Sequence, residues 1–363
     1  MLFLLHKNSE FSKKEGVCIN QVIPENQQLD SAPTVCMNWP KSVPKPFVGL
    51  VRNEETIGNN ASWPKYERFL KANNIPYGEL EISRSDFIDQ AKKYDIIVWR
   101  TETSYSKQWE AADKVEIIEK YLGKMIMPSS DSLWMDEDKV REQYLFEINN
   151  LPAIKTFISH SKEEVMDYIE TCQYPFISKD KICACGKGVY MIKTKPQARA
   201  LCKKIFSTGL DTNETYIKQK DYVYFQEFVP NHGFDLRIVI VGDSYFGYYR
   251  YPGEGDYKAS GSGIVEKKEL PEEVMILAKK VKDRLPKSIA LAVDFLKDTR
   301  DNKYYIIETC VFISIETSEQ LMVKHVSGRY IEKDGQFTFE AGRFWIQELM
   351  MEELMNEWIT THS

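Results

Sequence analysis

Two apolar stretches near the C-terminal third of the chain are each broken by a single carboxylate. Asp294 interrupts the run 289–296 and Glu308 interrupts the run 304–310, with a turn at 298–302 between them. An unpaired carboxylate is costly inside a strand this apolar, so each acid needs a partner. The pattern predicts a β-hairpin whose acids share a metal ion or pair with neighbouring arginines.

Candidate partners for those acids lie in the two preceding apolar strands. Asp235 and Arg237 are two residues apart in the strand 235–241, so they lie on one face of it. Arg250 ends a second strand and is followed by the turn 252–256 and Lys258. A salt bridge on a solvated sheet face is the alternative interpretation of Asp235 and Arg237.

Further upstream, residues suited to phosphate follow another apolar strand. The strand 174–178 ends at Lys179 and runs into the loop 183–189, which contains Gly186, Lys187 and Gly188. Glycines let backbone N–H groups approach phosphate oxygens closely. Each feature has an ordinary explanation, since strand-end lysines, glycine turns and helical lysines such as Lys139 are mostly solvated.

Taken in order, these features predict one nucleotide site. Lysines suit phosphate, acids suit a divalent metal, and the end of the strand 225–229 has backbone groups able to pair with an adenine edge. The strand end comprises Gln226, Glu227, Phe228 and Val229.

Composition favours a globular protein of several units over a nucleic-acid-binding or membrane-spanning one. The 363 residues are 43% apolar and carry a net charge of −6, which favours two or three globular units and argues against a general nucleic-acid binder. No apolar run approaches about 20 residues, so we expect no membrane span. Seven scattered cysteines favour a reducing, cytoplasmic location, and the pair Cys183 and Cys185 has no second pair at zinc spacing.

The hydrophobic pattern predicts the order of the elements. Segment 1–7 is expected to form a first strand, and 20–46 is rich in Asn, Gln, Ser and Pro, as in a linker. Strands and helices then alternate to about residue 130, which is typical of a parallel sheet. The expected strands are 47–51, 78–82, 94–99 and 124–128, and the expected helices are 66–72, 86–93 and 109–122.

Beyond residue 130 the pattern changes toward α+β. Strands dominate after residue 222, and the expected helices are 136–149, 162–171, 197–206, 272–285 and an amphipathic C-terminal helix at 344–359. That last helix either closes the core, which is the simpler interpretation, or forms a homodimer contact.

The ordered set resembles the ATP-grasp superfamily, the ATP-dependent carboxylate–amine ligases of the RimK type and the D-alanine–D-alanine ligase type. The resemblance covers about residues 136–320. It implies a pre-ATP-grasp α/β domain at 1–130, an ATP-grasp subdomain A with the glycine loop at 131–220, and a subdomain B with the metal site at 221–363. It also implies ATP and Mg²⁺, or alternatively Mn²⁺, as cofactors.

The resemblance also implies a role for each matched residue. Lys139 and Lys179 resemble the lysines that hold the α- and β-phosphates, and the loop resembles the flexible cover of the γ-phosphate. The segment 226–229 is similar to the adenine hinge, and Asp235 to the ribose acid. Arg237 resembles an arginine near the acceptor, Arg250 and Lys258 resemble catalytic cations, and Asp294 and Glu308 resemble the metal acids.

Four positions depart from the family pattern. Cys183 stands where glycine is usual, Asp180 where proline is frequent, Lys258 where arginine is usual, and Cys310 where the last metal ligand is usually asparagine. A thiol is a poor Mg²⁺ ligand, because this ion prefers oxygen.

The implied activity is an ADP-forming ligase that joins a small carboxylate, through an acyl phosphate, to an amine. Two alternatives remain: a degenerate ATP-grasp protein that binds nucleotide or a partner without ligation, and an ATP-grasp kinase. The sequence names neither the carboxylate nor the amine.

Overall fold

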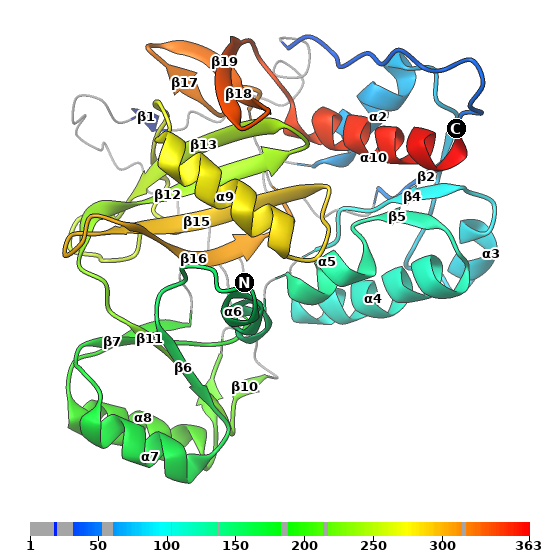
Figure 1. Cartoon of the computed structure of the whole chain (residues 1–363). Helices are drawn as coiled ribbons and strands as arrows, with labels where there is room; N and C mark the ends of the chain where they lie inside the picture. The colour runs from blue at the N-terminus through cyan, green and yellow to red at the C-terminus, as the bar shows by residue number, and fades with distance from the viewer. Residues whose placement is uncertain are drawn as a thin grey trace, which may run out of the picture.

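The computed structural model describes residues 18–19, 32–52, 61–102, 104–136, 138–182, 188–212, 217–313 and 317–363. Three main sheets organise these residues, and Figure 1 shows them in separate parts of the molecule. The predicted fold class, a parallel α/β unit followed by α+β subdomains, is confirmed. The segment 1–7, which was expected to be a strand, lies outside the described residues. So does the first part of the predicted linker, residues 20–31.

The N-terminal unit is built on a four-stranded parallel sheet in the order β3-β2-β4-β5. Its central strands are apolar and buried, as expected for a parallel sheet covered on both faces. The strands are β2 (Val48–Leu50), β3 (Tyr77–Glu79), β4 (Ile96–Val98) and β5 (Met125–Met127). The helices are α2 (Trp63–Ala72), α3 (Phe87–Ala91), α4 (Tyr105–Glu116) and the π-helical segment η1 (Ile117–Tyr121).

Several predicted bounds were wrong in this part of the chain. The helix predicted at 109–122 begins at Tyr105, and its last turn is the π-helical η1. A short helix, α5 (Ser130–Met135), was not predicted; the Ser129 hydroxyl caps it by accepting from the Ser132 N–H. The helix predicted from residue 136 is α6 (Lys139–Ile148), which begins later because Asp138 is its N-cap.

A smaller antiparallel sheet follows, in the order β6-β11-β7-β8. Two helices cover one face of this sheet at the lower left of Figure 1, and their apolar residues Val165, Ile169 and Ile205 pack with Phe176 and Phe225. The elements are β6 (Thr156–Ser159), α7 (Lys162–Thr171), β7 (Phe176–Lys179), β8 (Val189–Ile192), α8 (Lys195–Ile205), β9 (Leu210–Asp211), β10 (Lys218–Gln219) and β11 (Val223–Glu227).

The largest sheet holds nine strands, with the central order β14-β13-β12-β15-β16. Helix α9 packs on β12 and β15, and α10 packs against both α2 and β12, as Figure 1 shows. The elements are β1 (Cys18–Ile19), β12 (Asn231–Val241), β13 (Ser244–Tyr251), β14 (Ile264–Glu266), α9 (Glu272–Arg284), β15 (Ala290–Asp298), β16 (Tyr304–Cys310), β17 (Met322–Val323), β18 (Val326–Lys333), β19 (Gln336–Ala341) and α10 (Ile346–His362).

The C-terminal helix contributes to the core. Leu349 and Leu354 of α10 are buried with residues of α2, and the Trp358 indole N–H donates to the Pro44 carbonyl at 2.9 Å. Burial of this helix ties the end of the chain to the N-terminal unit. In the described part of the chain, no helix has both the length and the apolar character needed to cross a membrane.

Candidate functional site

A cavity lies between the small sheet and the large sheet and gathers most of the predicted site residues. Apolar side chains from both sheets, including Ile177, Val189, Leu296 and Ile307, form part of its lining. The predicted residues that line it are Lys139, Lys179, Gln226, Glu227, Phe228, Val229, Asp235, Arg250, Lys258, Asp294 and Glu308.

The large-sheet wall carries a row of charges because of strand register. Asp235 on β12 lies opposite Arg250 on β13, and Arg237 lies opposite Asp294 on β15. Asp294 in turn lies opposite Glu308 on β16. Residues directly opposite one another in antiparallel strands share a face, so four strands present their charged side chains together.

Four of these side chains form one buried ion-pair network. Arg237 binds Asp294 through two hydrogen bonds, Nε to Oδ1 at 2.7 Å and Nη2 to Oδ2 at 2.8 Å. Arg250 donates from Nη2 to Asp294 Oδ2 at 2.7 Å and from Nε to Asp235 Oδ1 at 2.6 Å. Asp294 therefore pairs with both arginines, which is the alternative to a metal partner that the sequence left open.

The network separates the pKa values of its two acids. Burial opposes ionisation of Asp294, but the charges of Arg237 and Arg250 outweigh it and lower the Asp294 pKa. Burial, with the nearby negative charge of Asp294, raises the pKa of Asp235 to about 6 despite its bond to Arg250. The two arginines balance the two aspartates, so this four-residue network is close to neutral when both acids are ionised.

The side of the cavity formed by helix α6 and the small sheet is more cationic. Lys139 of α6 and Lys179 of β7 are buried, and Lys139 Nζ lies 3.5 Å from Glu308 Oε2 on β16. The Lys179 ammonium lies 5.9 Å from the centre of the Tyr224 ring. Burial, with Glu308 and Asp136 nearby, raises the pKa of Glu142 well above its usual value, against the opposing effect of the Lys139 charge.

Two acids that the sequence analysis missed hold the strand end beside Glu308. Glu142 Oε2 accepts from the Thr309 N–H at 3.2 Å, and Asp136 Oδ1 accepts from the Val311 N–H at 2.7 Å. Glu142 lies three residues after Lys139, on the same face of α6. That spacing was the sequence signal that could have identified Glu142 as a residue near the site. The hydrogen bonds fix β16 against α6 and hold Glu308 next to Lys139.

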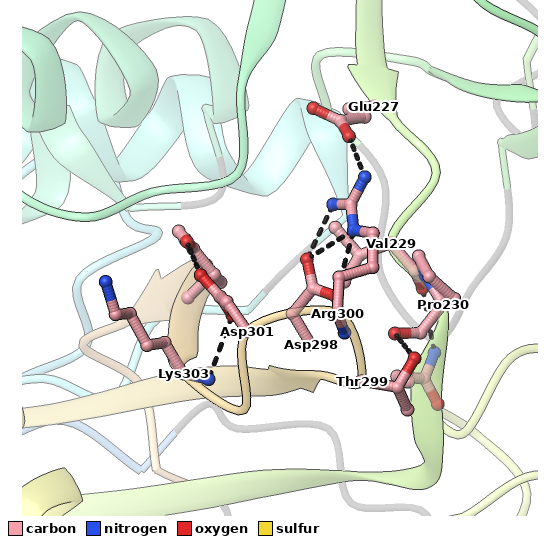
Figure 2. Close-up of polar contacts among 10 residues, drawn as sticks. Glu227, Val229, Pro230, Asp298, Thr299, Arg300, Asp301 and Lys303 are labelled. Carbon is pink, nitrogen blue, oxygen red and sulfur yellow. Dashed lines mark hydrogen bonds and ion pairs between the residues drawn. The ribbon is translucent and has the colours of Figure 1, made fainter.

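The hinge segment 227–230 connects the two sheets at the cavity edge. The Glu227 N–H donates to the Lys155 carbonyl at 2.9 Å, and Gln226 Nε2 lies 3.3 Å from both Thr156 Oγ1 and the Tyr224 hydroxyl. Figure 2 shows the Glu227 carboxylate directed at Arg300, from the turn after β15. No sequence signal marked Arg300, since it lies in a polar turn.

Some predicted residues are placed differently. Arg237 is not among the residues that line the cavity and reaches the site through Asp294. Gly188 has a φ of 70°, which favours glycine, and its carbonyl accepts from the Asp180 N–H. Gly186, Lys187, Cys183 and Cys185 lie outside the described residues. The Cys310 thiol donates to the Phe312 carbonyl at 3.1 Å.

A metal ion would have few protein ligands here. Within the described residues, no group of three or more His, Cys, Asp or Glu side chains is arranged to hold one. Asp294 and Glu308 are two carboxylates on adjacent strands and the same face, and further ligands would have to come from a bound molecule or water.

Comparison with protein-family models identifies the chain. Residues 136–332, more than half of it, match the RimK-like ATP-grasp domain. The protein belongs to the RimK-like ATP-grasp family. The matched residues include strands of both sheets that flank the cavity, and the predicted series of charges lies between these sheets.

Curated relatives of this ATP-grasp protein match over about half of its length. It is 30% identical over 177 residues to an alpha-aminoadipate–LysW ligase, LysX, from Saccharolobus solfataricus, which is 47% of this chain and 60% of that one. It is 27% identical over 184 residues to a tetrahydromethanopterin:alpha-L-glutamate ligase from Methanocaldococcus jannaschii, 49% of this chain and 60% of that one. The chain thus spans about three fifths of these relatives.

Solved ATP-grasp structures share the fold over most of the chain. The D-cycloserine synthetase DcsG has a TM-score of 0.60 at 12% identity, covering 86% of this chain and 99% of that one. A D-alanine–D-alanine ligase from Bacillus anthracis has a TM-score of 0.56 at 14% identity, covering 87% and 98%. At these identities the likeness shows the fold alone.

Proposed function

We propose that this protein is an ATP-dependent, ADP-forming ligase that joins a carboxylate to an amine. The observation that carries the proposal is the cavity between the two ATP-grasp sheets. There, two buried lysines, Lys139 and Lys179, oppose the row of Asp294, Glu308 and Arg250. Cations able to hold a polyphosphate and acids able to hold its metal are thus assembled on opposite walls.

The phosphate roles follow from the small-sheet wall. Lys139 and Lys179 neutralise phosphate oxygens that gain charge as the γ-phosphoryl group leaves. Arg250 is directed into the cavity by its bonds to Asp235 and Asp294, and it stabilises the acyl phosphate and the oxyanion that the amine forms. Lys258 lines the same cavity and adds a second cation.

The base and ribose roles belong to the segment that joins the two sheets and to the strand β12 that follows it. The hinge residues Gln226, Glu227, Phe228 and Val229 hold the adenine edge. Asp235 stays our candidate for the ribose acid, although one of its oxygens already accepts from Arg250. Arg237 acts through Asp294, which it orients with two hydrogen bonds.

The residues present fit one Mg²⁺ ion held jointly with a nucleotide. Among the described residues, one hydrogen bond is given to Asp294 Oδ1, from Arg237 Nε, and a carboxylate oxygen has two lone pairs. Glu308 lies opposite Asp294 and is partly exposed toward the cavity. Both are the oxygen ligands that Mg²⁺ prefers, and Mn²⁺ suits the same ligands. When bound, the ion would neutralise phosphate charge.

The substrates are proposed only as classes. The curated relatives are named for ligating alpha-aminoadipate with LysW and tetrahydromethanopterin with alpha-L-glutamate. We propose a small carboxylate and an amine for this chain, without nucleic acid or membrane, in the cytoplasm. The proposed division is 1–130, 131–220 and 221–363; β11 (Val223–Glu227) pairs within the small sheet, which favours moving the second boundary to the hinge.

One experiment separates this function from its main alternative. ATP binding is measured by calorimetry with and without Mg²⁺, and ADP release is then measured against pooled carboxylates and amines. A ligase needs both a carboxylate pool and an amine pool for ADP release, whereas a kinase needs one acceptor. Binding that ignores Mg²⁺, with no ADP from any pool, would contradict both enzymes.

The degenerate interpretation is motivated by Cys183 and Cys310, and Cys183 lies outside the described residues. Cys310 occupies the position where the family pattern places a third metal ligand, and its thiol is directed at the Phe312 carbonyl. A nucleotide-binding protein without ligase activity would retain ATP affinity and release no ADP in the experiment above.

A further inference from the structure

The turn between β15 and β16 forms hydrogen bonds with both ends of the hinge segment 227–230. Figure 2 shows Arg300 between Asp298 and Glu227, and Thr299 against Pro230. The turn belongs to the large sheet, whereas Glu227 ends a strand of the small sheet. Contacts made by this turn therefore fix the small sheet's hinge relative to the wall that carries Asp294 and Glu308.

Arg300 is itself fixed before it reaches the hinge. Its backbone N–H and Nε donate to Asp298 Oδ1 at 2.8 and 3.0 Å, and its Nη2 donates to Asp298 Oδ2 at 2.6 Å. The Asp298 side chain is 3% exposed, so this carboxylate is a rigid anchor. The remaining Nη1 donates to Glu227 Oε1 at 2.6 Å. Planar guanidinium geometry holds both carboxylates in one arrangement, which an ammonium cannot do.

The far end of the hinge is held through the backbone. Thr299 donates to the Pro230 carbonyl twice, from its N–H at 2.9 Å and from Oγ1 at 3.1 Å. The turn is closed by hydrogen bonds from Asp298 N–H to the Lys303 carbonyl and from Asn302 N–H to the Asp298 carbonyl, both 2.9 Å. Phe228 and Val229, which line the cavity, thus lie between two fixed points.

We propose that Arg300 is a positioning residue for nucleobase recognition: it fixes the Glu227 end of the hinge so that the 227–229 backbone meets the base. This inference rests on the proposed nucleotide function of the cavity. Arg300 is half-exposed and outside the cavity lining, so it acts through Glu227 and not by touching phosphate. Loss of Arg300 should therefore weaken binding of the nucleobase and leave binding of the triphosphate unchanged.

The test compares ATP with inorganic tripolyphosphate, each with Mg²⁺, by competition against a fluorescent ATP analogue. Arg300→Met is expected to weaken ATP binding about tenfold, the size of one charge-assisted hydrogen bond, and tripolyphosphate binding less than about twofold. Arg300→Lys keeps the charge without the planar geometry, and it should bind ATP as weakly as Arg300→Met. Wild-type affinity in Arg300→Lys, or equal loss for both ligands, would overturn the inference.

Two controls isolate the route of the effect. Lys303→Met removes one positive charge from the same turn and should leave both affinities unchanged. In a Glu227→Ala background, Arg300→Met should reduce ATP affinity no further, because the Arg300–Glu227 contact is already absent. Additive losses of ATP affinity would contradict action through Glu227. If wild-type protein binds no ATP, the proposed function fails as well, whereas normal ATP binding by Arg300→Met overturns this inference alone.

Discussion

The buried charged side chains on the two sides of the cavity have different kinds of neighbours. On the large sheet, Arg237 and Arg250 are matched to Asp294 and Asp235 at 2.6 to 2.8 Å, so each charge has a partner before any ligand arrives. On the side formed by α6 and the small sheet, Lys139 Nζ lies 3.5 Å from Glu308 Oε2, and the Lys179 ammonium lies 5.9 Å from the centre of the Tyr224 ring.

This difference indicates which role each wall can have in binding a ligand. A tightly paired network is stable and geometrically fixed, but removal of one member leaves another charge buried without compensation. Lysine ammonium groups that line a cavity, as those of Lys139 and Lys179 do, can donate to the oxygens of a polyanion. We infer that the large sheet provides fixed geometry for the reacting group and the small sheet provides affinity for phosphate.

The largest expected effect breaks the large-sheet network. Arg250→Ala should reduce ADP release about 10²- to 10³-fold, as the loss of a transition-state donor does, and leave ATP binding mostly intact. It should also lower the free energy of unfolding by about 3–5 kcal/mol, because Asp235 loses its partner. Steady-state ADP assays and urea titration measure the two effects.

A compensated variant separates these two effects. Arg250→Ala combined with Asp235→Asn removes the uncompensated charge and should recover much of the stability without recovering ADP release. Arg329→Ala is the matched control, since Arg329 belongs to the same sheet and pairs with Glu340 instead. Loss of nucleotide binding in folded Arg250→Ala would contradict the division between the walls.

The next effect concerns the small-sheet wall. Lys179→Met should weaken ATP binding about ten- to a hundredfold, the range for lost hydrogen bonds to a charged group, with a small change in unfolding free energy. Calorimetry measures the affinity. Lys193→Met, an exposed lysine just beyond β8, serves as the control for the change in net charge. Equal weakening in both variants would show that only long-range charge matters.

A smaller effect tests the raised pKa of Asp235. Its folded pKa of about 6 lies above the ordinary value of 3.8, so the folded state binds more protons between these values. The unfolding free energy contributed by Asp235 therefore falls as pH rises from about 4 to 6. Asp235→Asn should remove this slope, so wild type should lose about 1–3 kcal/mol relative to the variant over that window. Parallel stability curves would refute the assignment.

The smallest expected effect concerns the metal end of the large sheet. Cys310→Asn replaces a thiol by an oxygen ligand, so the Mg²⁺ concentration for half-maximal ADP release should fall by about tenfold or less. Cys172→Asn, at a partly buried cysteine outside the cavity, is the control. No change with Cys310→Asn would indicate that Asp294, Glu308 and the nucleotide already complete the coordination.

Local pattern was sufficient for much of the fold. The helix 162–171 was predicted with its observed bounds, because an N-cap serine, two acids in the first turn and an apolar face agree there. Bounds failed where a single side chain decided them, as at Asp138, which caps α6 and delays its start. Residue types at the site were also visible, since isolated charges in apolar strands are costly and therefore conspicuous.

Sequence alone determined that the chain carries lysines, arginines and acids in the order of an ATP-grasp site, several of them in or next to predicted strands. Only the tertiary structure decided their partners. Asp294 could have met a metal or an arginine, and strand register placed it between Arg237 and Arg250. Arg300 and Glu142 gained their contacts from segments 73 and 167 residues away, because contacts between distant segments depend on how the sheets pack, which no local pattern encodes.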